Sequence, residues 1–369
     1  MGETTFTTSH GLTVKRWNPA LAVEAENKQY FKKFIGTGED AMIKALTDLS
    51  KGNKGDRITV GLSMKLKGDG IWGDNSIEGT SAEEALELFD CSVFITQRRK
   101  GVKSKGKLSD KRVLFDFRSR GVSALSTWFA EDADQLLFAY LSGSRGSDTT
   151  FHIPTAFTGI DGNNITDIDS NHVIYAGDAS AITDLTEQDK MHINIIEKCN
   201  AKAETLDPMI QPFMINGEKK FVLLMHTWQK YDLRTSISDN DWLRIHRDTD
   251  GKDSPIYKNT LGEYGNVIMH DHRNVIRLSS ATTPAMASGM TGARALFLGA
   301  QAGIICFGGA TDTTRYDLNE ETEDRGNKTV LTGSNMMGMQ RAIYDYNDDG
   351  TDETIGLFAV DTYAADPNA

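Results

Sequence analysis

Residues 57–73 read RITVGLSMKLKGDGIWG, and the interpretation of this stretch decides the fold. Before the glycines, apolar residues alternate strictly with polar or small ones, which is the period of a strand with one apolar and one solvated face. Gly68, Gly70 and Gly73 then have the G-x-G-x-x-G spacing of a dinucleotide-binding loop. The stretch therefore begins either a nucleotide-binding unit or a projecting hairpin.

The residues around the glycines favour the hairpin. A dinucleotide fingerprint needs a buried parallel strand before it and a helix after it, because the amino terminus of that helix holds the pyrophosphate. Here the strand is amphipathic, and residues 74–81, DNSIEGTS, are typical of turns. A second alternating segment at 89–96 can pair with the first. We therefore predict a long two-stranded projection with an elaborate tip, and keep a nucleotide-cofactor-binding oxidoreductase as the enzyme alternative.

The composition is that of a soluble globular protein. The chain has 369 residues, of which 25% are charged and 39% hydrophobic, and its net charge is -12. That charge argues against tight binding of nucleic acid over the whole surface. Cys91, Cys199 and Cys306 are odd in number and far apart, so they suit a reducing compartment better than a disulfide framework or a zinc site. The amino terminus has no export signal, and we expect the protein to be made in a cytoplasm.

The clearest helix prediction covers residues 115–142, where apolar residues recur every three or four positions and Gly143 follows at the stop. At about 1.5 Å per residue such a helix is roughly 40 Å long, which makes it a structural spine. Residues 1–56 predict an arm with short helices, one of them over 39–52. With few apolar residues, this arm should gain most of its stability by lying on another surface.

The remainder of the chain mixes helices with strands. We predict strands over 221–226 and 266–272, and helices over 186–203 and 292–304. The apolar run from 295 to 310 is too short and too rich in glycine for a membrane span, so it is interpreted as a buried helix running into a turn.

Two strand-like pieces close the chain, at 337–346 and 353–363. Asp349-Gly350 between them favours a hairpin turn. The same region resembles the opening of a calcium loop, but Gly356 stands where a bidentate Glu is needed. Residues 144–182 show no sustained period and are predicted to be an irregular insertion.

Catalytic and metal-binding patterns are weak throughout. His270 and His272 fall on one face of a predicted strand, and together with His226 they could hold a metal ion. Histidines that pack or bond to backbone are commoner on strands, and no carboxylate spacing strengthens the metal hypothesis. Neither a P-loop nor a recognisable catalytic triad is visible. We therefore predict no catalytic, cofactor-binding or metal-binding residues and no cofactor.

Residues 98–112, RRKGVKSKGKLSDKR, form a strongly basic run in an acidic chain, with eight basic side chains and one acid, Asp110. Such a run is either a solvated loop or a contact with nucleic-acid phosphate or an acidic neighbour. No aromatic residue interleaves it, so base stacking is not expected. Self-association is the preferred interpretation, and a DNA-binding module is the alternative. Acidic clusters that could receive the run are Glu83, Glu84 and Glu87, and Glu320, Glu321, Glu323 and Asp324.

Several motifs occur together in a fixed order. They are KRWNPALAVEAENKQYFKKFIG (15–36), GDRITVGLSMKLKGDGIWGD (55–74), FITQRRKGVKSKGKLSDKRVLFDFRSRG (94–121), MHTWQKYDLR (225–234), EYGNVIMHDHRNV (263–275), ARALFLGAQAG (293–303) and IGLFAVDTYA (355–364). In this order they resemble the major capsid proteins of tailed bacteriophages, in particular the phage N-four-like group. The resemblance covers most of the chain, and residues 144–182 and 235–260 match it least.

The resemblance implies an α+β protein with the HK-ninety-seven-type phage capsid fold. Its implied parts are an N-terminal arm (1–56), an extended β-hairpin loop (57–112), a peripheral domain with a long spine helix (113–150), an axial domain (151–312), and a return through the peripheral domain to a C-terminal strand (313–369).

The same resemblance implies a structural major capsid protein and not an enzyme. Copies would self-assemble into hexamers and pentamers of an icosahedral shell around double-stranded DNA, which they would contact without sequence specificity. Each extended loop would lie across the neighbouring subunit, with its apolar face covered there. Portal, scaffolding and decoration proteins are the further implied partners, and no membrane is involved. The expected location is the virion capsid, assembled in the host cell cytoplasm.

The expected assembly contacts lie in the arm and in the extended loop. The glycines would let the loop tip bend, and Trp72 would dock on the next subunit. The full set comprises Trp17, Gly68, Gly70, Trp72, Gly73, Arg98, Arg99, Lys100, Lys103, Lys105 and Lys107.

Overall fold

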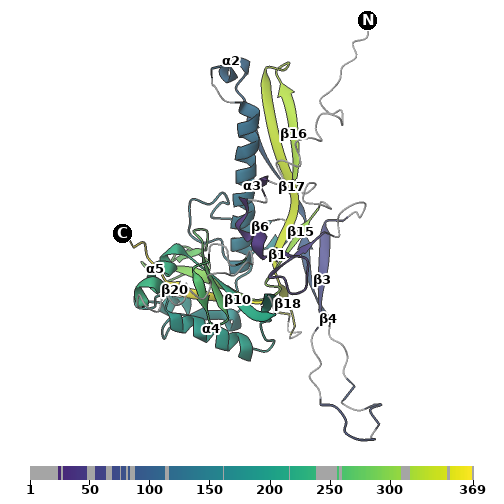
Figure 1. Ribbon diagram of the computed structural model, residues 1–369, viewed down its shortest axis with the longest axis vertical. Helices are drawn as coiled ribbons and strands as arrows, with labels where there is room; N and C mark the ends of the chain where they lie inside the picture. Colours follow the sequence, from purple (N-terminus) through teal and green to yellow (C-terminus); the bar gives the residue numbers. More distant parts are fainter. Residues whose placement is uncertain are drawn as a thin grey trace.

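The computed structural model describes residues 24–25, 28–47, 55–63, 69–74, 76–79, 82–83, 88–112, 116–160, 162–215, 217–237, 256, 260–308, 316–346 and 350–367. The molecule is elongated, with a helix and a β-ribbon along its long axis and a more compact sheet unit beside them (Figure 1). A separate hairpin points in the opposite direction from the ribbon.

The long axis is built on the helix α3, Phe117–Ser142. Asp116 caps its amino terminus, where the carboxylate accepts hydrogen bonds from the N–H groups of Arg118 and Ser119. Gly143 ends the helix in the left-handed conformation, with φ of 66°. The predicted spine helix and its glycine stop are confirmed.

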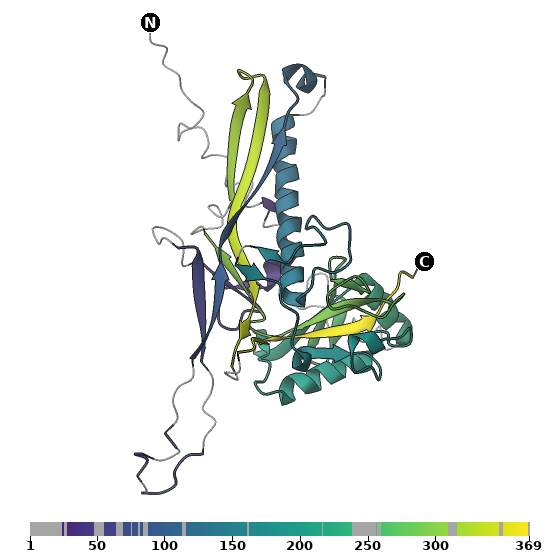
Figure 2. The same cartoon turned by 180° about the vertical axis from the view of Figure 1, so that it is seen from behind.

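A β-ribbon runs alongside the spine helix (Figure 2). Its central strand β17, Lys328–Arg341, pairs antiparallel with β5, Thr96–Lys103, on one side and with β16, Tyr316–Glu323, on the other. The carboxyl end of β17 pairs with β15, Gly303–Phe307. On its other side β15 pairs with β2, Ile43–Leu46, and β2 pairs in turn with β1, Ile35–Gly36.

Apolar side chains fix the helix to the outer half of the ribbon. A buried cluster there contains Val122, Leu125, Phe129, Tyr316, Leu318 and Leu331. Gly121 allows close approach, because a Cβ at this position would lie 2.6 Å from Leu331 Cδ1. The helix and the ribbon therefore pack as one rod.

The compact unit contains a mixed sheet with helices beside it. Its main path is β11 (Gly262–Tyr264), β12 (Val267–Asp271), β10 (Glu218–Met225), β14 (Thr291–Leu298), β20 (Leu357–Tyr363) and β8 (Val173–Tyr175). Attached to it are β9 (Phe213–Ile215), β13 (Arg277–Ser279), α4 (Ile193–Thr205) and α5 (Thr227–Ser236). The strands predicted over 221–226 and 266–272 are confirmed.

Two helix predictions are wrong. Residues 292–304 form most of β14, a turn and the start of β15, rather than a helix. This run is apolar at nearly every position because it is buried on all sides, so it has no period that distinguishes strand from helix. The helix predicted over 39–52 is wrong for its described residues 39–47, which contain the strand β2 between β1 and β15, whereas 48–52 lie outside the described residues. The helix predicted over 186–203 begins later, at Ile193.

The projecting hairpin is formed by β3, Arg57–Ser63, and β4, Leu88–Phe94, which pair antiparallel as predicted. A smaller hairpin, β18 (Ile343–Tyr344) with β19 (Glu353–Thr354), encloses the predicted turn. However, the long strands on its two sides, β17 and β20, belong to different sheets.

The other described elements are short: η1 (Tyr30–Phe34), α2 (Lys107–Asp110), β6 (Gly159–Ile160), β7 (Asn163–Asn164), η2 (Ser170–His172) and η3 (Ile182–Asp184). Within the part of the chain described above, no helix is both long and apolar enough to cross a lipid bilayer.

Candidate assembly surfaces

The base of the projecting hairpin is held by its own chain. Cross-strand pairs such as Ile58 with Val93 and Val60 with Cys91 form its apolar face. That face packs in one cluster with residues of β15 and β18, among them Ile304 and Ile343. The expectation that a neighbouring subunit covers this face is therefore wrong for the described strands, because the same chain already buries it.

The hairpin tip is different, because large apolar side chains are exposed there. Trp72 is 84% exposed and Ile77 is 53% exposed. Gly73 has φ of 75° and Gly79 has φ of 73°, so both occupy the left-handed region that favours glycine. Trp72 thus lies at the end of a glycine-shaped tip, where a second molecule can reach it.

The predicted contact residues of this region and the cofactor alternative can be compared with the structure. Gly70, Trp72 and Gly73 are at the tip, whereas Gly68 and Trp17 lie outside the described residues. The helix that a dinucleotide site needs is missing from the described residues after the glycines, which are turns and extended chain.

Residues 98–103 of the basic run lie on the ribbon strand β5 and residues 107–110 on the short helix α2, so only 104–106 and 111–112 of the run are loop or turn. Arg98 pairs with Asp132 of the spine helix at 2.6 Å, and Lys103 pairs with Glu323 of β16. Arg118 pairs in turn with Glu320 at 2.5 Å. Part of the acidic cluster at 320–324 is thus paired with cations of its own chain, with Lys103 of β5 across the strand β17 and with Arg118 of the spine helix.

Asp132 is fully buried beside the ribbon, and burial raises its pKa to about 6 although Arg98 acts in the opposite direction. Arg98 and Lys100 both lie over the ring of Trp128, at 5.5 and 5.3 Å from its centroid. These two basic residues therefore stabilise the rod itself. Other cations of the run remain exposed: Arg99, Lys105, Lys107, Lys111 and Arg112.

Residues 28–34 of the predicted arm pack into the subunit. The carboxylate of Asp134 on the spine helix accepts hydrogen bonds from the N–H groups of Tyr30 and Phe31, at 2.8 and 3.2 Å. Phe31 and Phe34 are buried in the main core. Burial raises the pKa of Asp134 to about 7, against the effect of the two N–H groups. This segment is thus stabilised by its own chain, which corrects the expectation of an arm lying on another surface.

A buried ionic junction joins the spine helix to the sheet unit. Arg294 on β14 forms two hydrogen bonds of 2.8 Å with the carboxylate of Asp361 on β20. It also pairs with Asp167 at 2.8 Å and donates to the Ser142 carbonyl at the end of the helix. Burial alone would lower the pKa of Arg294, but the two carboxylates raise it above its usual value.

A second arginine extends this junction to the ribbon. Arg341 at the end of β17 donates to the carbonyl oxygens of Thr166 and Asp167, at 3.1 and 2.9 Å. Burial lowers its pKa to about 10. Neither arginine can be recognised from the sequence, because its partners are far away in sequence and no motif marks it.

The three histidines of the metal hypothesis have packing or capping roles. His270 packs edge-on against Phe34, with ring centroids 5.5 Å apart. His226 caps α5 and accepts a hydrogen bond from the Trp228 N–H at 3.2 Å. His272 stacks on Phe138, with ring centroids 5.2 Å apart. Burial lowers the pKa of both imidazoles to about 4. The residues that the structure describes contain no group of three or more His, Cys, Asp or Glu side chains able to hold a metal ion.

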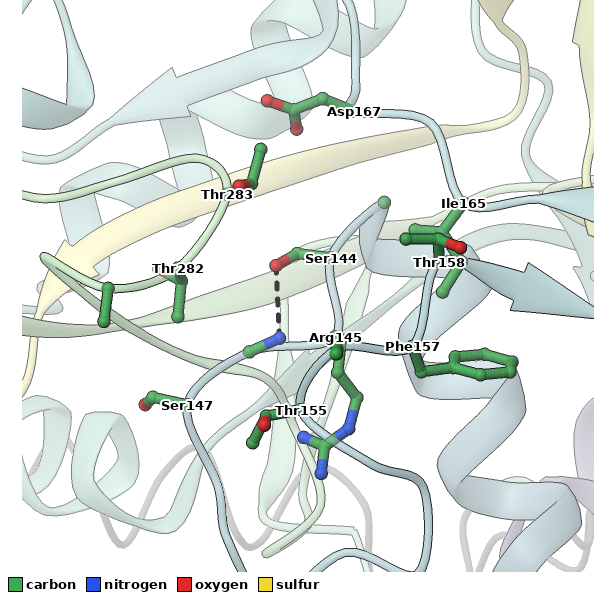
Figure 3. A pocket seen from close by; sticks show the side chains of 14 residues that line it. Ser144, Arg145, Ser147, Thr155, Phe157, Thr158, Ile165, Asp167, Thr282 and Thr283 are labelled. Atoms are coloured by element: carbon green, nitrogen blue, oxygen red, sulfur yellow. Dashed lines mark hydrogen bonds between the residues drawn. The ribbon is translucent and has the colours of Figure 1, made fainter.

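A groove of about 530 Å³ opens at the end of the spine helix (Figure 3). Hydroxyl side chains dominate its lining, including those of Ser144, Thr155 and Thr282. Its charged lining residues, Arg145 and Asp167, are already engaged by the Ile153 carbonyl and by Arg294. The groove thus has the chemistry of a structural crevice and not of a catalytic centre.

Comparisons with known proteins agree on one class. The family model described as phage capsid protein matches residues 5–366. The major capsid protein of Pseudomonas phage KPP25 is 27% identical over 366 residues, which covers 93% of each chain.

Solved structures give the same result. The capsid of Ralstonia phage GP4 is 34% identical, with a TM-score of 0.84 and 100% of both chains covered. The capsid asymmetric unit of cyanophage Pam1 has 18% identity and a TM-score of 0.68, with 99% of this chain and 97% of the other covered, and so supports the fold.

Proposed function

Because the chain belongs to the phage capsid protein family, we propose that it forms the hexamers and pentamers of an icosahedral shell around double-stranded DNA. It is a major capsid protein with the HK-ninety-seven-type fold, a structural component of the virion and not an enzyme. Copies of it assemble with one another into the capsid shell. The similarity of fold over the whole length of the GP4 capsid chain is the observation that carries this conclusion.

We also propose a division into arm, extended loop, peripheral domain and axial domain. In this proposal the hairpin β3–β4 belongs to the extended loop and the spine helix with the ribbon to the peripheral domain. The mixed sheet would belong to the axial domain, although its strand β20 comes from the segment 313–369 and not from 151–312. Residues 28–47 and β5 pack with the subunit core and the ribbon. We propose that the part of the extended loop that contacts other subunits includes the described tip residues 69–74 and 76–79.

The assembly contacts follow from what a single chain leaves exposed. Trp72 of the loop tip is exposed in the single chain, and a shell would give it a neighbouring copy to contact. A large, multi-contact interface of this kind suits a permanent assembly.

The net negative charge of the chain supports a shell that does not bind the packaged DNA tightly. A net charge of -12 disfavours strong general attraction to phosphate, so packaged DNA can enter and leave. Portal, scaffolding and decoration proteins are proposed as further partners, and assembly is proposed to occur in the host cytoplasm.

Electron microscopy of the full-length chain tests the function directly. We expect purified protein, or lysate of cells that produce it with a scaffolding protein, to contain closed shells built from hexamers and pentamers. A small, monodisperse oligomer that binds a nicotinamide cofactor would overturn the proposal.

A further inference from the structure

The amine of Lys33 lies among aromatic side chains of its own chain. Lys33 belongs to η1, and its side chain is partly exposed. Its Nζ lies 4.6 Å from the ring centroid of Tyr30 and 4.9 Å from that of Phe34. Nζ is also 3.2 Å from Nδ1 of His270, a residue of β12 that is fully buried. The amine is thus drawn toward the core, while part of the side chain stays open to solvent.

The surroundings of Lys33 differ from those of another lysine that packs into the subunit. Lys220 on β10 is buried, but its Nζ lies 3.0 Å from a carboxylate oxygen of Glu218 and also pairs with Glu263. Burial would lower the pKa of Lys220, yet the two carboxylates raise it above its usual value. The ring nitrogen beside Lys33 belongs to an imidazole, which is a base and brings no negative charge. The two sites therefore favour opposite protonation states.

The surroundings of Lys33 favour the neutral amine. Burial lowers the pKa of Lys33 to about 8, although the ring faces act in the opposite direction because they attract an ammonium group. With this pKa, about a tenth of the Lys33 amines are neutral at pH 7, against fewer than about one in a thousand for an ordinary lysine. The titratable groups around this amine are Tyr30 of η1, His270 and Asp271 of β12, His272 directly after β12, and Asp134 of the spine helix.

A neutral amine is the nucleophilic form of lysine, and removal of the amine from water is one way in which proteins produce it. We propose that Lys33 is a modification site, at which acyl donors of the thioester and acyl-phosphate classes react first among the described lysines. The proposal goes beyond the assembly of a shell and does not depend on it.

The reaction is an acyl transfer to nitrogen. The lone pair of Lys33 Nζ forms a bond to the acyl carbon, and the bond from that carbon to sulfur or to the phosphate oxygen breaks with its electron pair. A proton of the amine passes through water to the thiolate or phosphate that leaves. The product is a neutral amide, so the modification removes one positive charge beside the rings of Tyr30 and Phe34.

Acetylation of the full-length, unassembled protein with a limiting amount of acetyl phosphate tests the proposal, with peptide mass spectrometry as the measurement. At pH 7, the rate constant at Lys33 should exceed that at the exposed Lys219 by about tenfold. The rate constant at Lys33 should level off above about pH 9, once its amine is neutral. In concentrated urea the two rate constants should agree within about twofold, because unfolding removes the aromatic surroundings.

Lys33→Arg and Lys219→Arg are the matched variants, since each keeps the positive charge and removes the amine. The first should lower the incorporation of the first acetyl group, and the second should leave it unchanged. The comparison of native with unfolded wild type keeps the test valid if a variant folds poorly.

Equal native rate constants at Lys33 and Lys219, a preference for Lys33 that persists in urea, or a rate at Lys33 that still rises at pH 10 would each overturn the proposal. None of these results bears on the proposed function, which the formation of shells tests separately.

Discussion

Buried charged side chains hold the spine helix and the mixed sheet together. Arg294 has a side chain that is 1% exposed, and Asp361 has one that is 0% exposed, yet each satisfies the other through two hydrogen bonds. The pair also holds the carboxyl end of the spine helix through the Ser142 carbonyl. An ionic contact thus joins the spine helix to the mixed sheet.

Arg294→Met should lower the free energy of unfolding by about 3–5 kcal/mol, because it leaves Asp361 buried without its cation. Chemical denaturation of the full-length chain measures this loss. Arg325→Met removes an exposed arginine and should change the stability by less than about 0.5 kcal/mol. Equal effects of the two substitutions would contradict the importance of the junction.

Asp134 should make the stability depend on pH. Burial raises its pKa from 3.8 to about 7, so between these values the folded state holds a proton that the unfolded state lacks. Its contribution to stability is full below about pH 4 and is lost as the pH rises through 7. His272 acts in the opposite direction, since its lowered pKa of about 4 removes stability as the pH falls from 6.5.

Asp134→Asn isolates this effect from that of the histidine. The amide loses one acceptor for the Tyr30 and Phe31 N–H groups, which is a cost independent of pH. Relative to the wild type, the variant should gain on the order of 1–4 kcal/mol between pH 4 and pH 8. Denaturation at several pH values measures the difference, and a constant difference would show that the carboxyl group titrates normally.

At the scale of elements, the ribbon and the hairpin cross where there is no room for side chains. Gly338 on β17 lies under β4, and a Cβ there would be 2.1 Å from the Phe94 carbonyl oxygen. Backbone atoms cannot move aside as a flexible side chain can. The crossing therefore depends on a glycine for steric reasons alone.

Gly338→Ala should destabilise the subunit by about 1–3 kcal/mol, because the strands must separate. Gly61→Ala is the matched control on strand β3, since nothing lies within 4 Å of a Cβ there. Thermal unfolding compares the two variants with the wild type. A loss at Gly61 as large as that at Gly338 would contradict the steric explanation.

The hairpin tip, in contrast, belongs to the assembly and not to the subunit core. Deletion of residues 68–79 should leave the subunit folded, since the apolar face of β3 and β4 stays covered by its own chain. Assembly into shells should be strongly impaired, because Trp72 is lost. Circular dichroism and electron microscopy measure these two properties. An unfolded isolated subunit would show that the tip contributes to the core instead.

At the scale of the whole molecule, one continuous core runs through parts that differ in shape. The main cluster includes Phe31 before the spine, Leu136 in the spine helix, Met339 in the ribbon and Phe358 in the mixed sheet. The elongated outline therefore does not imply independently folded domains.

Calorimetry should detect a single main unfolding transition for the isolated subunit, because the rod and the sheet unit share this core. Far-ultraviolet and near-ultraviolet circular dichroism should give the same midpoint within about 2 °C, as two-state behaviour requires. Two well-separated transitions would show that the ribbon and the sheet unit unfold independently.

The sequence by itself determined the elements whose evidence is local. The spine helix has a continuous period, a capping Asp116 and a terminal Gly143, and the hairpin has strict alternation on both strands. The ordered motifs also identified the capsid family and its fold. The helix and hairpin signals each lie within a short window of sequence, so no knowledge of distant contacts is needed to recognise them.

Only the tertiary structure decided the rest. Residues 292–304 became strands because neighbouring strands on both sides complete their hydrogen bonds, and a segment buried all round has no period to reveal this. Arg98 pairs with Asp132, which is 34 residues away in sequence, and Arg294 pairs with Asp361, which is 67 residues away. No sequence motif indicates either pair. Such partners are chosen by packing between distant segments, because burial makes an unpaired charge costly wherever the fold places it.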